Sequence, residues 1–313
     1  MRLRDTSSIT EPGTAAVLRA RHQHGVTLIE LVVVIGVLAV IATVAAVALH
    51  GPIQAYADIN RRAELTNIAD TALRRMARDI RLALPNSIRV NGSNIEMLLT
   101  KTGGRYREQP NGSGQGDVLD FAQPDTAFDT LGPLSNAPSP VTAGDILVVY
   151  NVYADPAIPS ANAYTYNSNH CGTPSSPSCN TALITGTGAG ALPNETRISF
   201  QARQFPYASP GNRFHVIESS PVSYECLPGP LDAQGNATGT LKRITGYPIA
   251  LAQPTGSAFG TASLLANYVA DCQITYSPLV LTQSLGLVSM TLKLTRGGES
   301  VSLYHEVHVT NIP

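Results

Sequence analysis

The hydrophobic pattern divides the chain into an apolar run, an amphipathic segment and a long region of alternating positions. Residues 31–49 carry no charged side chain over nineteen positions, which is about the length that a helix needs to cross a bilayer. Between residues 53 and 84, apolar residues recur at steps of three and four, a spacing typical of an amphipathic helix. These residues are Leu65, Ala69, Leu73, Met76, Ile80 and Leu84. The pattern predicts a long N-terminal helix over residues 26–85, with the membrane span at about 26–49 and the amphipathic part at 53–84.

Gly51 and Pro52 interrupt this helical pattern, because glycine weakens a helix and proline removes a backbone donor. One interpretation is a bend or a locally melted turn at His50-Gly51-Pro52. Another is a second helical segment that begins with Pro52. Both predict a flexible joint after the membrane span. Pro85 and Asn86 predict the end of the helix.

From residue 86 to the end of the chain the apolar positions alternate, which is typical of strands. Residues 87–90 and 95–99 flank Asn91-Gly92-Ser93-Asn94 and predict a hairpin, and Arg296-Gly297-Gly298-Glu299 predicts a hairpin turn. Further strands are expected at 118–121, 145–153, 197–200, 214–218, 222–227, 241–247, 268–276, 287–294 and 301–309. Segments 122–144 and 154–196 are rich in Pro, Gly, Ser, Asn and Ala, and predict long surface loops. The expected fold class is α+β, with a long N-terminal helix packed on a largely antiparallel β-sheet head, residues 86–313.

Composition and charge place the head outside the cytoplasm. The 313 residues have a formal net charge of −1, so no bulk charge indicates a nucleic-acid partner. Charged residues make up 14% of the chain, against about 25% in ordinary soluble domains. The 26 glycines and 22 prolines indicate a loop-rich head. Arginines at positions 2, 4, 19 and 21 precede the apolar run and favour a cytoplasmic N-terminus by the positive-inside rule.

A short motif stands at the start of the apolar run, where Gly25 and Val26 are followed by Thr27-Leu28-Ile29-Glu30. It resembles the prepilin signal of type IV pilins and type II secretion pseudopilins, although most members have Phe in place of Val26. The resemblance implies a leader peptide over residues 1–25. It also implies cleavage between Gly25 and Val26, and methylation of the Val26 amine, by the prepilin peptidase/N-methyltransferase. An uncleaved signal anchor is the alternative interpretation.

Glu30 is the one charged residue at the edge of the apolar run. A charge at the centre of a membrane helix costs roughly 2.5–3.5 kcal/mol, and less toward an end. A carboxylate in such a place usually has a partner. If the chain is cut after Gly25, the free amine of Val26 in a neighbouring subunit can supply it. Glu30 is therefore expected to act in assembly.

Several segments beyond the span are similar to MshO-type minor pilins of MSHA (mannose-sensitive haemagglutinin) pilus biogenesis. They are residues 52–56, 61–65, 73–87, 103–107, 214–217, 222–226, 297–301 and 305–309. The resemblance implies a minor pilin of an MSHA-like type IV pilus, a structural subunit rather than an enzyme. It also implies a location in the bacterial inner membrane, with the head in the periplasm, and then in the assembled pilus. The expected partners are other major and minor pilins, the inner-membrane assembly platform and the lipid bilayer.

Two other functions stay open. Arg78-Asp79-Ile80-Arg81 is also similar to minor pseudopilins of type II secretion. A membrane-anchored binding head carried by the filament is the third possibility, with its surface in segments 122–144 and 154–196. The exposed arginines of the amphipathic segment are interpreted as a solvated or subunit-facing surface. They are Arg74, Arg75, Arg78 and Arg81. Three pairs of opposite charge stand four residues apart and are expected to pair on the outer faces of the helix: Asp58/Arg62, Asp70/Arg74 and Arg75/Asp79.

Four cysteines lie beyond the membrane span and allow three pairings. Cys171 and Cys179 enclose a short polar loop, and Cys226 and Cys272 each stand in an expected strand. The favoured pairs are Cys171–Cys179 and Cys226–Cys272, and the oxidising periplasm makes disulfides the expected state. A zinc site is the alternative, but no CxxC spacing supports it.

Other apparent motifs predict no chemistry. His305 and His308 point to opposite faces of a strand, so with Glu306 they do not make a metal site. Gly186-Thr187-Gly188-Ala189-Gly190 lacks the Lys-Ser/Thr of a phosphate-binding loop and is interpreted as a flexible loop. No spacing indicates a catalytic constellation, and neither a cofactor nor a metal is expected.

Overall fold

The computed structural model describes residues 25–134, 139–154, 159–168, 171, 179–256, 259–278 and 285–313. The chain divides into two compact units, Met1–Tyr56 and Ala57–Pro313. The described part of the first unit is the beginning of helix α1 (Leu28–Arg81). The second unit contains the rest of that helix and two β-sheets.

Helix α1 is continuous over 54 residues and includes Pro52. The interruption expected at His50-Gly51-Pro52 is therefore wrong as a break in secondary structure. Proline removes its own donor from the helical ladder and crowds the preceding turn, but residues 44–49 and 53–55 on either side of His50-Gly51-Pro52 are helical, and the helix continues through Pro52. The helix ends where Leu84 N–H donates to Leu98 O and Thr100 N–H donates to Leu82 O, because the chain there joins the β-structure.

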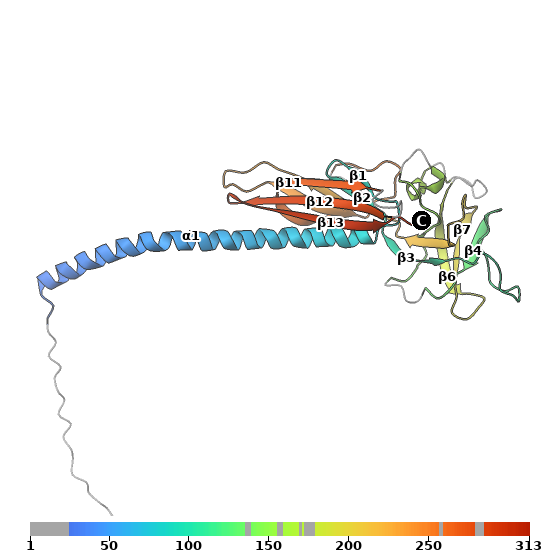
Figure 1. Cartoon of the computed structure of the whole chain (residues 1–313), viewed down its shortest axis with the longest axis horizontal. Helices are drawn as coiled ribbons and strands as arrows, with labels where there is room; N and C mark the ends of the chain where they lie inside the picture. The colour runs from blue at the N-terminus through green and yellow to red at the C-terminus, as the bar shows by residue number, and fades with distance from the viewer. Residues whose placement is uncertain are drawn as a thin grey trace, which may run out of the picture. The chain divides into compact units, whose positions relative to one another are not determined.

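The first sheet is antiparallel and has seven strands in the order β1-β2-β9-β10-β11-β12-β13. Its strands are β1 (Arg89–Asn91), β2 (Asn94–Met97), β9 (Val222–Leu227), β10 (Gly239–Thr245), β11 (Thr261–Ser277), β12 (Leu285–Arg296) and β13 (Glu299–Thr310). Figure 1 shows the C-terminal part of α1 lying along β11, β12 and β13. The two layers enclose the main core.

The apolar stripe of the helix forms one wall of this core. The predicted stripe is confirmed, since all six of its members are buried. Five of them belong to one cluster with residues of the sheet such as Tyr224, Met290 and Leu292. Leu84, which follows the helix, packs in a smaller cluster with Ile146 and Ile217. Burying a side chain such as Leu or Met contributes roughly 1.5–3 kcal/mol, so the helix is an integral part of the head.

The second sheet has six strands in the order β3-β8-β5-β6-β7-β4. They are β3 (Thr100–Arg105), β4 (Asp125–Asp129), β5 (Ile146–Val148), β6 (Thr181–Ala189), β7 (Thr196–Arg203) and β8 (Arg213–Ile217). Short 3₁₀ turns, η1 (Pro159–Ala161) and η2 (Ala163–Thr165), follow β5. The core of this sheet is aromatic and contains Tyr106, Phe128, Phe200, Phe205 and Phe214.

The predicted strands and turns are confirmed in the first sheet and partly wrong in the second. The hairpin around Asn91-Gly92-Ser93-Asn94 forms, with Asn91 opposite Asn94. The β12–β13 turn also forms: Arg296 pairs with Glu299, and Gly297 and Gly298 have φ values of 57° and 81°. Such positive values suit glycine in a two-residue turn.

The corrections concern the segments expected to be loops. Segment 122–144 contains β4, and segment 154–196 contains β6. The glycine-rich stretch 186–190 begins inside β6 and is not simply a flexible loop. Segment 118–121 forms no strand, and the strand expected at 145–153 is reduced to β5. Residues 155–158, 169–170 and 172–178, which include the polar loop between Cys171 and Cys179, lie outside the described residues.

Candidate assembly site

The first turn of α1 is built by the motif that begins at Thr27. Its side-chain Oγ1 accepts a hydrogen bond from Glu30 N–H at 3.3 Å, and its carbonyl accepts from Leu31 N–H at 3.1 Å. Thr27 is therefore the N-cap of the helix. The Thr-x-x-Glu spacing is the signature of a capping box. This second role of the motif as a helix cap was not predicted, although the Thr-x-x-Glu spacing indicates it.

Glu30 stands in the first turn of the helix, where the helix dipole favours a negative charge by about 0.3–1 kcal/mol. Its side chain is exposed, as is that of Val26. Among the described residues, no cation of the same chain forms an ion pair with Glu30. The carboxylate and the Val26 backbone are both accessible to another molecule.

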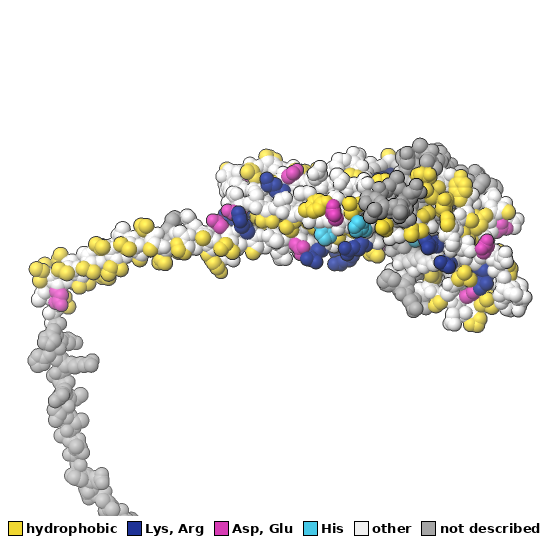
Figure 2. Space-filling model, in the orientation of Figure 1, with side chains coloured by type: hydrophobic (Ala, Val, Ile, Leu, Met, Phe, Trp, Pro, Cys, Tyr) yellow, Lys and Arg dark blue, Asp and Glu magenta, His cyan; other side chains and the backbone are white. Residues whose placement is uncertain are grey.

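The beginning of α1 is apolar on every side. All described side chains from Val26 to Leu49 are exposed, and Figure 2 shows hydrophobic side chains along this part of the helix. An 18-residue window of α1 has a mean hydropathy of 3.0 and is 0% buried. The hydroxyl of Thr43 donates to Ala39 O at 2.7 Å, so this polar group is satisfied within the helix. By length and composition the helix can span a membrane.

Charged residues in the second unit hold α1 to the tip of the β12–β13 hairpin. Arg61 Nη1 donates to Gly297 O at 2.9 Å, and Arg62 Nε lies 2.5 Å from Glu299 Oε2. Arg296 Nη1 lies 2.7 Å from both carboxylate oxygens of Glu64. The helical pair expected between Asp58 and Arg62 is not formed, because Arg62 turns to the hairpin.

Farther along the helix, the two other i,i+4 pairs differ in their exposure to solvent. Arg74 and Asp70 pair on the surface at 2.6 Å, as expected. Asp79 is 5% exposed and lies 4.0 Å from Arg75. The expectation of an outer-face pair is therefore wrong for Asp79, which faces the sheet.

Asp79 is the polar centre of the helix–sheet interface. Its Oδ2 accepts from the Tyr224 hydroxyl and from Arg243 Nε, each at 2.7 Å. Burial, followed by the nearby Asp79 carboxylate, raises the pKa of Tyr224, so the hydroxyl keeps its proton and donates. A buried carboxylate held by two donors fixes the position of the helix on the sheet.

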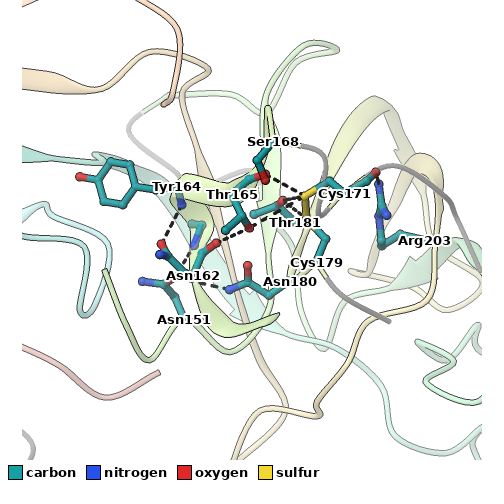
Figure 3. Close-up of a disulfide and its surroundings, with 11 residues drawn as sticks. Asn151, Asn162, Tyr164, Thr165, Ser168, Cys171, Cys179, Asn180, Thr181 and Arg203 are labelled. Carbon is teal, nitrogen blue, oxygen red and sulfur yellow. Dashed lines mark hydrogen bonds between the residues drawn. A yellow bond between two sulfur atoms is a disulfide. The ribbon is translucent and has the colours of Figure 1, made fainter. Parts of the chain in front are cut away.

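Two disulfides stabilise the second unit, with the partners favoured from spacing. Cys226 on β9 is joined to Cys272 on β11, within the main core. Cys171 is joined to Cys179 just before β6, and Figure 3 shows the polar side chains around this bond. Arg203 Nη2 donates to Cys171 O at 3.2 Å.

The histidines near the C-terminus do not converge. On β13, His305 is half-buried while Glu306 and His308 are exposed, as alternation along a strand requires. Within the ranges that the structure describes, no group of three or more His, Cys, Asp or Glu side chains could hold a metal ion.

Comparison with known families gives one match, to the prokaryotic N-terminal methylation motif over residues 20–46. A search of curated proteins and a search of solved structures each found no match. The matched stretch includes Gly25, Val26, the capped helix start and Glu30. The motif and the exposed apolar helix that follows it together support the assignment of the chain as a type IV pilin-like protein, a subunit of a pilus or pseudopilus.

Proposed function

We propose that the protein is a minor pilin of an MSHA-like type IV pilus. The observation that supports this proposal best is the capped, fully exposed apolar helix within the matched methylation motif. An apolar surface of this size must be buried, either in lipid or against other helices. The helix of a pilin is buried in the inner membrane before assembly and among the helices of other subunits in the filament.

In this proposal the prepilin peptidase/N-methyltransferase removes residues 1–25 and methylates the amine of Val26. The new amine is cationic, and Glu30 of an adjacent subunit supplies its counter-charge in the apolar filament core. The head lies in the periplasm before assembly. Other major and minor pilins and the inner-membrane assembly platform are the partners.

Mass analysis of the protein extracted from membranes tests the processing step. We expect a mature chain that begins with methylated Val26. A Gly25→Leu variant should keep its leader, because a bulky side chain blocks approach to the scissile bond, whereas Gly36→Leu, farther along the helix, should be cleaved normally. A native N-terminus at any other residue would contradict the proposal.

A minor pseudopilin of a type II secretion system is the second candidate, favoured by the Arg78-Asp79-Ile80-Arg81 segment. The two candidates differ in where the mature protein accumulates. We expect it in sheared surface filaments, and we expect loss of the pilus assembly platform to abolish that recovery. If loss of the protein instead blocks enzyme secretion and leaves pili intact, the pseudopilin is correct.

A further inference from the structure

A basic pocket lies where the end of α1 meets the second sheet. It has a volume of about 540 Å³, and its lining includes Arg81, Thr100, Lys101, Gly103, Arg213 and His215. Figure 1 shows the end of α1, β3 and the C-terminus close together, and residues at and after the end of β13 complete the lining. We propose that this basic pocket binds a phosphate group, either as inorganic phosphate or as a phosphomonoester. The proposal goes beyond the role in a filament and does not depend on it.

Two arginines of the lining carry positive charge that no acidic residue balances. Arg81 is the last residue of α1 and is exposed, and Arg213 begins β8 and is half-buried. Over the described residues, neither side chain forms an ion pair or a hydrogen bond. Arg105 stands directly opposite Arg213 in the β3–β8 ladder, and like charges in such a pair destabilise a sheet. An anion bound in the basic pocket would offset this repulsion.

Lys101 is the third cation of the lining, and its charge is balanced by Asp145. Its Nζ lies 3.0 and 2.8 Å from the two carboxylate oxygens of Asp145, and no acidic side chain is among the lining residues that the structure describes. Arg81 and Arg213 therefore leave the basic pocket with two positive charges. A phosphomonoester carries a charge of about −1.5 to −2 at pH 7 and can neutralise both, whereas one carboxylate group neutralises only one.

Two side chains of the lining have a buried polar atom with no hydrogen-bond partner in the part of the chain that the structure describes. These atoms are Nε2 of His215 and Oγ1 of Thr100. Buried polar atoms in native proteins almost always have a partner, so two of them in one pocket point to a bound group that accepts their hydrogens. Burial, followed by Arg213, lowers the pKa of His215 to about 4. Its imidazole is therefore neutral at pH 7 and can donate one hydrogen bond to a phosphate oxygen.

Gly103 leaves space beside the imidazole of His215. The two residues stand opposite each other in the β3–β8 ladder, and a Cβ at Gly103 would lie 3.2 Å from His215 Nδ1. A side chain at position 103 would therefore narrow the basic pocket at this point.

These features together fit a phosphate group. Guanidinium groups bind phosphate oxygens through paired, charge-assisted hydrogen bonds, and Arg81 and Arg213 approach the pocket from different elements. The volume lies within the range of small-molecule sites and exceeds what a single phosphate ion needs. The basic pocket can therefore also admit the organic part of a phosphomonoester.

The test uses the full-length protein in an uncharged detergent that has no phosphate group. Titration calorimetry measures the binding of inorganic phosphate and of glycerol 3-phosphate, with succinate as the control anion at the same ionic strength, because salt screens charges. We expect at least one phosphate probe to bind and succinate not to bind. Tighter binding of glycerol 3-phosphate identifies a phosphomonoester as the ligand, and equal or tighter binding of inorganic phosphate identifies the free ion.

Variants of the two arginines locate the site. Arg81→Gln and Arg213→Gln should each weaken phosphate binding at least tenfold, because each removes charge-assisted hydrogen bonds. Arg78→Gln is the matched control and should bind as the native protein does, since Arg78 is exposed on the same helix and does not line the pocket. The imidazole NMR signal of His215 should shift on saturation with phosphate, whereas that of His305 on β13 should not.

Thermal melting of all three variants establishes that they are folded. The proposal is overturned if neither phosphate probe binds, if succinate binds as tightly as they do, or if the two pocket variants bind as well as the Arg78 variant. A His215 signal that phosphate leaves unchanged would also overturn it. So would an acidic peptide or a single-stranded oligonucleotide that binds the pocket in place of the phosphate probes.

Discussion

Two buried ionisable residues in the head respond to pH in opposite directions. The pKa of Glu96 is raised to about 7, because burial disfavours its charged form more than Arg89, 3.0 Å away, favours it. The pKa of His215 is lowered to about 4 by burial and, secondarily, by Arg213. Folded Glu96 holds its proton up to a higher pH than unfolded Glu96, so its contribution to stability falls as pH rises from about 4.5 to 7. Folded His215 loses its proton at a lower pH than in the unfolded chain, so its contribution rises between about pH 4 and 6.5.

We therefore expect the two effects to offset one another in the native protein between about pH 4.5 and 6.5. Glu96→Gln removes the falling contribution, so the melting temperature of this variant should rise with pH more steeply than that of the native protein. His215→Asn removes the rising contribution and should give the opposite change. Thermal melts at pH 4.5, 5.5, 6.5 and 7.5 measure both. Parallel pH profiles for the native protein and the two variants would contradict the assignment.

The buried carboxylate of Asp79 gives a second prediction at this scale. Asp79→Asn leaves the partly buried Arg243 without its counter-charge, which should cost about 3 kcal/mol of unfolding free energy. Asp70→Asn is the matched control on the same helix, because the Asp70–Arg74 pair is largely exposed and contributes at most about 0.5 kcal/mol. Urea denaturation measures both values. Equal losses would show that Asp79 has no special role in the helix–sheet interface.

At the scale of elements, the helices and strands that could be predicted are those with a regular spacing of apolar residues. The apolar stripe of α1 and the strands of the first sheet have clear periods of 3.6 and 2, and the structure contains both. The continuous helix through Pro52 was not predicted, because local propensity gives Pro a large penalty that its neighbours here overcome.

The strands of the second sheet were harder to predict because glycine and polar residues build them. β3 contains Gly103 and Gly104, which read as a loop signal. In the structure a Cβ at Gly103 would lie 2.9 Å from Phe214 O, and one at Gly104 would lie 3.1 Å from the Phe214 ring. These glycines permit close approach of β3 and β8. Only the neighbouring strand gives them this role, so no local pattern could indicate it.

The contiguous part of the candidate site could be predicted from the sequence, but its contacts between distant residues could not. The Gly25–Glu30 motif and the span are visible in the sequence, because they are contiguous. Asp79 and Arg243 come from distant segments that only the fold brings together.

The two disulfides should differ in their contribution to stability. Loop entropy predicts about 4 kcal/mol for Cys226–Cys272, which closes 46 residues, and about 2.5 kcal/mol for Cys171–Cys179, which closes 8. We therefore expect the Cys226→Ala/Cys272→Ala variant to melt at a lower temperature than the Cys171→Ala/Cys179→Ala variant. Calorimetry of protein from periplasmic expression gives the comparison. The reverse order would show that local packing, rather than chain entropy, dominates.

At the scale of the whole molecule, the proposed pairing of Glu30 with the Val26 amine of an adjacent subunit can be tested by removing the charge. Glu30→Gln keeps the shape of the side chain and removes its charge, so membrane insertion and cleavage should remain. Burying the Val26 amine without a partner would cost several kcal/mol, and we expect at least a tenfold loss from sheared filaments. Immunoblots of the filament and membrane fractions measure this distribution, with the exposed Asp271→Asn as control. Normal recovery of the Glu30 variant in filaments would disprove the pairing.

Because α1 supplies both the apolar anchor and one wall of the core, the place where the chain is cut decides whether a recombinant head can be produced. A fragment that starts at Ala57 retains the whole second unit, including Leu65, Met76 and Asp79. A fragment that starts at residue 86, where the helix pattern ends, lacks this wall and leaves the inner face of the first sheet uncovered.

We expect the 57–313 fragment to elute as a single monomeric peak in size-exclusion chromatography and the 86–313 fragment to aggregate. A monodisperse 86–313 fragment would show that the sheets fold without the helix. For immunisation or crystallisation, the apolar anchor can thus be removed as far as Tyr56, because the helix beyond it belongs to the head.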